Sequence, residues 1–328
     1  MYSELLEILR CPRTDSRLSL EEADRDGEKI RSGWLVSENG VHRYPIRDFV
    51  PRFVPESTYA DNFGMQWNHF RKTQLDSHSK LSISTDRFWN ATGWNPSSIA
   101  SQWVLDAGCG AGRFAEVALT AGAKVIALDY SDAVDACHDN LKQNPNLHVV
   151  QGNIYALPFQ RSFFPFVYSL GVLQHTPDVA KAFASLPPMV ARGGRLCADF
   201  YWKRFRSMMH AKYLWRPITK RVPQQKLFDV LQIVVPMALP ISQLLGRIPV
   251  AGKALKRLLP IADYTGVYPL SAEQLEEWAL LDTFDMLAPE YDSPQSASTV
   301  RGWFESAGLA DVEVFHGGHL VGRGRRPS

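Results

Sequence analysis

The sequence contains few cysteines and no closely spaced pair of them. Its 328 residues include four, at Cys11, Cys109, Cys137 and Cys197. Scattered single cysteines exclude a disulfide framework and make a zinc site built from cysteines unfavourable. We therefore expect no metal and a reducing compartment.

An export signal is also missing from the first residues. MYSELLEILRC carries Glu4 and Glu7 where a signal peptide needs a basic start and an apolar run. The sequence has no internal repeat and no low-complexity tract. With 45% hydrophobic and 21% charged residues it is typical of a globular protein of about two domains, and we expect it in the cytoplasm.

Acidic residues are nearly absent from residues 200–260. This segment has twelve Lys or Arg and one acid, Asp229, whereas the remainder of the chain has 24 basic and 33 acidic residues. Such a split indicates an anionic partner for the segment. Its uncharged run Val230–Gly246 contains Pro236 and Pro240, so we expect the run to be too short and too broken to span a membrane.

Strand and helix patterns alternate from Trp103 onward. WVLDAGCG is typical of a buried strand that enters a tight turn, GRFAEVALTAG of a helix, and KVIALDYS of a second strand. The alternation continues to residue 200, and strand patterns return in ADVEVF and HLVGRG. It predicts an α/β fold, with a Rossmann-like, seven-stranded, mostly parallel sheet and helices on both faces.

The turn after the first of these strands, DAGCGAG, is rich in glycine. Gly108, Gly110 and Gly112 allow the backbone to approach a ligand, and the helix that follows presents N–H groups to an anion. Dinucleotide enzymes use the same device. Their fingerprint, however, requires a glycine where this chain has Arg113.

Three further polar elements follow the next strands. Asp129 ends the second strand, where a carboxylate accepts hydrogen bonds from ribose hydroxyls, Asn153 lies in VVQGNIYALPF, and His175 lies in SLGVLQHTPD. Together with the glycine turn, they resemble the class I S-adenosylmethionine-dependent methyltransferases, in the group of the type 11 and UbiE-like enzymes. The resemblance covers residues 100–200 and implies S-adenosylmethionine as cofactor.

The resemblance also implies which residues hold the cofactor. Asp106 and the turn would surround its methionine end, Asp129 would bind the ribose, and Tyr130 would lie along the adenine. Asn153 stands where the family usually has Asp, and its amide can still accept from the adenine amino group. The implied set is Asp106, Ala107, Gly108, Cys109, Gly110, Gly112, Asp129, Tyr130, Asn153, Ile154 and Leu170.

Residues 1–56 resemble a second, smaller family. LLEILRCP and YPIRDFVPRFVP are similar to the Trm112-type zinc-ribbon module that often precedes methyltransferase domains. That family places a second cysteine near Ser16, and Cys11 alone cannot hold zinc. We therefore expect a β-rich module without zinc, serving for packing or as a cap on the substrate side, followed by one methyltransferase unit over residues 57–328.

Methyl transfer from a sulfonium is an in-line displacement, so positioning can supply most of the rate. A hydroxyl acceptor would benefit from a general base. His175 is the candidate because histidine ordinarily titrates near neutrality, and packing of its loop is the alternative. Gln66, Trp67 and His69 are the candidate substrate residues, with packing as the alternative for Trp67.

The basic segment, taken as residues 203–262, lies where this fold inserts a substrate lid, and a helix and strands over residues 271–328 would follow it. Three interpretations of its charge stay open: a lid with solvated cations, a lid that recognises an anionic substrate, and a surface helix that binds anionic lipid at the inner membrane face. Nucleic acid is not expected, because aliphatic runs separate the cations. The lipid interpretation predicts salt-sensitive vesicle binding that is lost when Lys253, Lys256 and Arg257 become Glu.

The sequence thus predicts a methyltransferase acting on a small molecule or on a lipid- or sugar-linked biosynthetic intermediate, at oxygen rather than carbon or nitrogen. Two alternatives stay open. One is a non-catalytic, membrane-associated adaptor that keeps the fold. The other is an NAD-dependent oxidoreductase, which binding of NADH without S-adenosylhomocysteine would favour.

Overall fold

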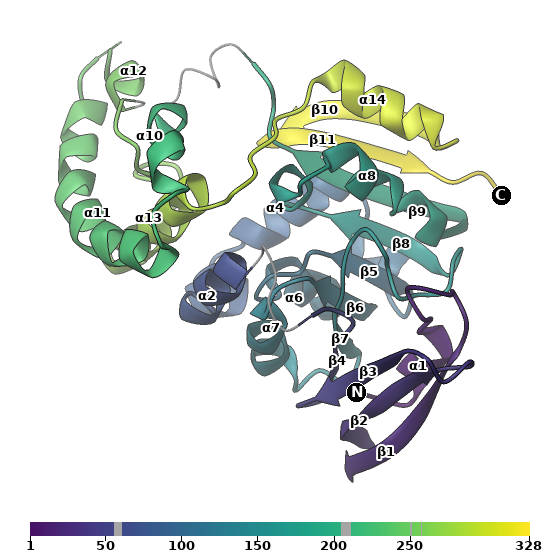
Figure 1. Ribbon diagram of the computed structural model, residues 1–328. Helices are drawn as coiled ribbons and strands as arrows, with labels where there is room; N and C mark the ends of the chain where they lie inside the picture. Colours follow the sequence, from purple (N-terminus) through teal and green to yellow (C-terminus); the bar gives the residue numbers. More distant parts are fainter. Residues whose placement is uncertain (56–60, 205–210, 250, 257) are drawn as a thin grey trace.

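A seven-stranded sheet forms the centre of the computed structural model, which describes residues 1–55, 61–204, 211–249, 251–256 and 258–328. The strand order is β10-β11-β9-β8-β5-β6-β7 (Figure 1). The strands are β5 (Trp103–Ala107), β6 (Lys124–Asp129), β7 (Leu147–Gln151), β8 (Phe164–Ser169), β9 (Val190–Phe200), β10 (Ala310–Gly317) and β11 (His319–Arg325). Strands β5 to β9 run parallel, and β11 runs antiparallel to both of its neighbours, β9 and β10. The predicted Rossmann-like α/β fold is confirmed.

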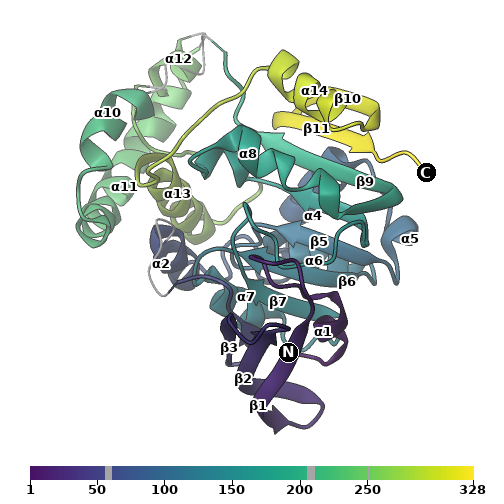
Figure 2. The ribbon, with the colours of Figure 1, turned by 45° about the vertical axis from the view of Figure 1, so that its right-hand side comes forward.

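Both faces of the sheet are buried, because successive side chains of a strand point to opposite sides. Val104 packs in one layer with α4 (Ile83–Thr92), α6 (Arg113–Thr120) and α7 (Ala133–Leu141). Its neighbour Leu105 packs in the other layer with α8 (Val179–Ala184) and α14 (Ala297–Ser306). Figure 2 shows helices on the two sides of the sheet. Other helices in this part of the chain are α2 (Asp61–His69), α3 (Asp76–Ser79), α5 (Pro96–Ile99), η1 (Leu173–His175) and η2 (Pro187–Met189).

The N-terminal residues form a small antiparallel sheet beside the main one. The sheet consists of β1 (Leu18–Asp26), β2 (Lys29–Ser37), β3 (Arg43–Arg47) and β4 (Val50–Pro51), and the helix α1 (Glu4–Ile8) precedes it. Leu5 and Leu35 belong to the same buried cluster as Leu105 of the main sheet. Arg52 pairs with Asp135 at 2.6 Å, which holds the end of the module against α7. The module therefore shares the core of the main sheet, and its likeness to the Trm112 type stays a prediction.

A separate helical layer lies beyond the carboxyl ends of the strands (Figure 1). It contains α10 (Lys212–Thr219), α11 (Gln224–Gly246), α12 (Gly252–Lys256) and α13 (Ala272–Leu287). Leu231 and Val235 of α11 share a buried cluster with Leu281 and Phe284 of α13. We expected the lid over 203–262, but α13 packs on α11 and belongs to the same layer. Residues 205–210, 250 and 257 of the lid lie outside the described residues, as does the side chain of Lys253.

Helix α11 differs from the sequence expectation, because it continues through Pro236 and Pro240. Each proline removes one backbone donor, which is costly within a helix. The neighbouring Val235 and Leu239 are buried against the helical layer, and this packing favours the continuous helix. By length and composition the helix could cross a membrane, although 33% of its apolar window is buried in the protein.

Candidate active site

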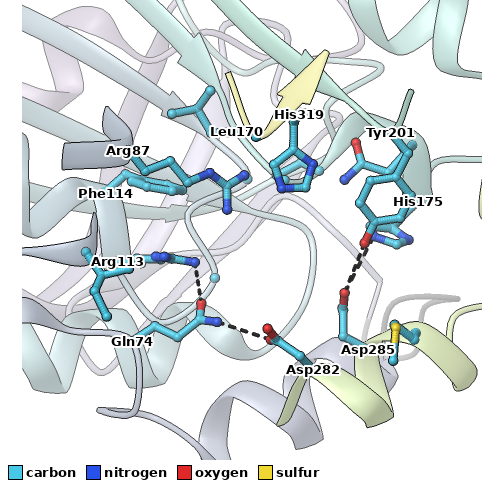
Figure 3. Close-up of a pocket in the computed structure, with 18 of the residues that line it drawn as sticks. Gln74, Arg87, Arg113, Phe114, Leu170, His175, Tyr201, Asp282, Asp285 and His319 are labelled. Carbon is cyan, nitrogen blue, oxygen red and sulfur yellow. Dashed lines mark hydrogen bonds and ion pairs between the residues drawn. The ribbon is translucent and has the colours of Figure 1, made fainter. Parts of the chain in front are cut away.

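A cavity of about 1520 Å³ lies between the carboxyl ends of the parallel strands and the helical layer. Side chains from the sheet side and from α13 face each other across it (Figure 3). Open α/β sheets bind their ligands at this edge. No described residue of the N-terminal module lines the cavity, and the module packs against the sheet.

The turn after β5 needs glycine at two positions. Gly108 has φ of +103°, and a side chain there would overlap Val172. Gly110 has φ of +52°, and a Cβ atom there would lie 3.2 Å from the indole nitrogen of Trp67. Only glycine adopts such angles freely, so the two residues keep the turn open to a ligand.

Asp129 lies at the end of β6 and faces this turn. Its Oδ2 accepts from the Gly110 amide at 2.9 Å, and its Oδ1 accepts from the amide and hydroxyl of Ser131 at 2.9 and 2.7 Å. Burial raises the pKa of Asp129, and these donors partly offset the effect. A carboxylate has about four acceptor positions, so a ligand hydroxyl can still bind to Oδ2.

Asp106 is buried below the turn, with 1% of its surface exposed. Burial raises its pKa to about 8, while the Tyr168 hydroxyl lowers it and the charge of Asp129 raises it further. The side chain is therefore protonated at neutral pH. The structure places it in the core beneath the site rather than in the cavity wall.

The predicted site residues divide into two groups. Nine of them line the cavity: Trp67, Gly108, Cys109, Gly110, Asp129, Tyr130, Ile154, Leu170 and His175. The other six lie outside its wall: Gln66, His69, Asp106, Ala107, Gly112 and Asn153.

Three residues of the second group have structural contacts of their own. The Oδ1 of Asn153 accepts from the Tyr155 amide at 2.9 Å and so stabilises a turn, and its contact with the adenine stays a prediction. His69 packs edge-on against Phe228, with ring centroids 4.8 Å apart. A Cβ atom at Gly112 would collide with Leu141, which explains the third glycine by packing.

His175 lies in η1, directly after β8, with 6% of its side chain exposed. Its Nδ1 is 3.1 Å from the carbonyl oxygen of Tyr291. A carbonyl can only accept, so Nδ1 carries the proton in this contact and a neutral ring has its lone pair on Nε2. Nε2 lies 4.0 Å from Oδ2 of Asp285, which also accepts from the Tyr201 hydroxyl at 3.3 Å.

Sequence reasoning missed Gln174, which precedes His175 and is fully buried. It lines the cavity, and neither atom of its side-chain amide has a hydrogen-bond partner among the residues that the structure describes. A buried amide without partners costs about 1 to 3 kcal/mol. The one feature of the sequence that could have indicated Gln174 is its position next to His175.

A buried ion pair near the end of β9 was also missed. Arg87 of α4 donates to Asp199 at 2.7 Å, and the Gly171 amide donates to the same carboxylate at 2.5 Å. Burial opposes the charge, but Arg87 holds the pKa of Asp199 below its ordinary value. Burial and the charge of Arg87 lower the pKa of His319, on the same wall, to about 4.

Arg113 and α13 supply a polar network across the cavity. Arg113 donates to Gln74 at 2.9 Å, and Gln74 donates to Asp282 at 3.2 Å (Figure 3). Burial, together with the nearby Arg87, lowers the pKa of Arg113 to about 10. Burial raises the pKa of Asp282 to about 6 although Tyr264 donates to it. These residues come from distant segments of the chain, so no local sequence motif predicts the network.

The site fits an adenosyl cofactor. The glycine turn gives access to the backbone, and Asp129 keeps an acceptor position for a ribose hydroxyl at the end of β6. Tyr130 and Ile154 line the adjoining wall. When bound, S-adenosylmethionine would supply an electrophilic methyl group to the remainder of the cavity.

Comparisons with known proteins agree with this reading. Residues 105–198 match the family model described as a methyltransferase domain, of type 11. The chain is 33% identical over 100 residues to a ubiquinone biosynthesis O-methyltransferase of Albidiferax ferrireducens, covering 29% of this chain and 40% of that protein. It is 36% identical over 91 residues to a malonyl-[acyl-carrier protein] O-methyltransferase of Pseudescherichia vulneris, covering 28% and 36%.

Solved structures include magnesium protoporphyrin IX methyltransferase of Synechocystis with bound S-adenosylhomocysteine. It is 14% identical, with 82% of this chain and 96% of that chain covered and a TM-score of 0.43. The chain spans less than half the length of these two curated relatives. The match to the family model, over residues 105–198, contains the glycine turn and Asp129. The chain therefore carries a class I S-adenosylmethionine-dependent methyltransferase domain, with S-adenosylmethionine as its cofactor.

Proposed function

We propose that this chain transfers a methyl group to a hydroxyl oxygen of a small molecule or of a lipid- or sugar-linked biosynthetic intermediate. The position of His175 in the cavity wall, shortly after β8, carries the proposal. Two of the relatives above are named O-methyltransferases, which supports oxygen as the acceptor atom.

His175 would hold the proton that a hydroxyl acceptor releases. The Tyr291 carbonyl orients the ring through Nδ1, so Nε2 is the basic nitrogen. Asp285, 4.0 Å from Nε2, would stabilise the imidazolium that forms. A hydroxyl placed near both groups would lose its proton to Nε2 as its oxygen gains the methyl group.

Gln174 lies beside His175 at the cavity wall, but its side-chain amide is fully buried and presents no accessible atom to the cavity. It therefore does not bear on the polarity of the acceptor.

An anionic group on the acceptor would bind to Arg87 and Arg113. Their guanidinium groups lie 5.2 and 5.0 Å from the centre of the Phe114 ring, on the cavity wall. The basic lid contributes less to this wall. Of its nine basic residues with described side chains, Arg204 and Lys212 line the cavity, and Lys212 bonds to Asp292 at 2.6 Å.

The test is an acceptor screen with methyl-labelled S-adenosylmethionine. Matched pairs should differ in one feature at a time: hydroxyl against amine, and phosphorylated against dephosphorylated. We expect labelled product from hydroxyl compounds, with the anionic member of a pair preferred and the label on oxygen by mass spectrometry. Label on carbon or nitrogen in the best product would refute O-methylation.

A further inference from the structure

The helical layer exposes an unusual amount of apolar surface. Among the residues that the structure describes, thirteen large apolar side chains are exposed, and eleven of them lie between Leu214 and Leu258. Single exposed apolar residues are ordinary, but a cluster of this size marks an interaction surface.

Six of these side chains form one face of α11, which we call the outer face. At about 100° per residue they fall within an arc of roughly 100°. Two of them, Ile233 and Met237, are 66% and 69% exposed. The outer face consists of Val230, Ile233, Val234, Met237, Ile241 and Leu244.

The opposite side of α11 is already packed. Leu227, Leu231 and Val235 are buried in the cluster that α11 shares with α13. A helix that spans a bilayer would have to leave this core, whereas a helix that lies along the bilayer surface would keep it. The packing therefore favours an interfacial helix.

The charged residues near the outer face are nearly all positive. Lys220, Arg221, Lys226 and Arg247 are exposed, and Asp229 is the one exposed acid in the described part of residues 211–258. Other lid cations have structural roles, since Lys256 pairs with Asp263 at 2.7 Å.

We propose that the outer face docks on an anionic phospholipid surface, with its apolar side chains among the acyl chains and the flanking cations at the headgroups. A second copy of the chain fits less well, because two such faces would bring cations of the same sign together. Docking does not depend on methyl transfer.

The proposal connects to the cavity through α13. This helix packs on α11 with one side and supplies Asp282 and Asp285 to the cavity with the other. A bilayer under the outer face would therefore be separated from the cavity by two helices, α11 and α13.

The test is co-sedimentation of the full chain with vesicles of phosphatidylcholine and phosphatidylglycerol, and with vesicles of phosphatidylcholine alone. We expect binding to the anionic vesicles that weakens with salt, and at least tenfold weaker binding to the neutral ones. Ile233→Glu/Met237→Glu and Lys226→Glu/Arg247→Glu should each lower the affinity at least tenfold. Lys226 and Arg247 replace Lys253 and Arg257 as the tested cations because their side chains are described and exposed.

The matched control for Ile233→Glu/Met237→Glu is Val41→Glu/Gln143→Glu, which also adds two negative charges but at exposed positions outside the lid. It should sediment like the wild type. Circular dichroism and affinity for S-adenosylhomocysteine should be unchanged in all variants, which separates docking from folding and from cofactor binding. The proposal is overturned if the wild type does not bind anionic vesicles or binds neutral vesicles equally well. It is also overturned if the Ile233→Glu/Met237→Glu variant loses self-association but still binds anionic vesicles like the wild type.

Discussion

The Gly110 amide donates to Oδ2 of Asp129 across 2.9 Å, joining the turn after β5 to the end of β6. The bond brings the two strongest sequence signals into one site, although they are 19 residues apart. It also leaves the carboxylate turned toward the cavity, where a ribose hydroxyl can bind.

The two glycines of the turn should tolerate alanine differently. Gly108→Ala places a side chain against Val172 at φ of +103°, so we expect a loss of more than about 2 kcal/mol in unfolding free energy. Gly110→Ala should cost about 1 kcal/mol, because φ of +52° is the left-handed region. Urea denaturation measures both. Adding Val172→Ala to Gly108→Ala should restore part of the loss, and no restoration would contradict the overlap.

Removal of the His175 imidazole should slow methyl transfer without weakening cofactor binding. We expect His175→Ala to lower kcat for a hydroxyl acceptor found in the screen by about 100-fold or more. His175→Asn keeps a donor for the Tyr291 carbonyl but has no basic nitrogen, so it should be equally slow. Equal kcat in wild type and His175→Asn, with unchanged pH dependence, would assign His175 to packing.

The buried Asp106 should make the domain less stable as pH rises. Its pKa is raised to about 8, so between pH 4 and 8 the folded state holds a proton that the unfolded state has lost. The wild type should lose stability across this window, on the order of a few kcal/mol. Asp106→Asn should flatten the pH dependence of the urea midpoint, whereas the exposed control Asp24→Asn should not. Parallel curves for wild type and Asp106→Asn would contradict the assignment.

Asp292 should be important for anchoring the lid. It bonds to Lys212 at 2.6 Å and lies 3.9 Å from Arg216, and all three side chains are largely buried. Asp292→Ala leaves buried cations without their carboxylate, so we expect about 3 to 5 kcal/mol of destabilisation. The exposed pair of Arg301 and Glu305 is the control, and Arg301→Ala should change stability by less than about 1 kcal/mol. Similar losses in both variants would show that the buried pair has no special role.

The sheet could be predicted from the sequence because its signals are local. Trp103, Gly108 and Asp129 lie in short segments whose periodicity and turns specify strand, turn and strand. The network around Arg113 could not be predicted, since Gln74, which accepts from Arg113, reaches Asp282 only after α13 joins the lid. The prediction that Pro236 breaks the apolar run was wrong for the same reason. Packing against α13 outweighs the local cost of a proline in α11.

Asp106 shows that a place in a motif does not give the direction of the side chain. Strand alternation turns this side chain into the core beneath the glycine turn, and its contact with the cofactor stays a prediction. Gln174 shows the converse, because nothing in its sequence context reveals that its amide lacks partners.

The most direct test of the account is calorimetric titration of S-adenosylhomocysteine into the wild type and Asp129→Ala, with NADH as the control ligand. We predict binding to the wild type at micromolar concentration, a loss of at least tenfold in Asp129→Ala, and no binding of NADH. Absence of S-adenosylhomocysteine binding to the folded wild type, or equal binding to Asp129→Ala, would contradict the assigned site.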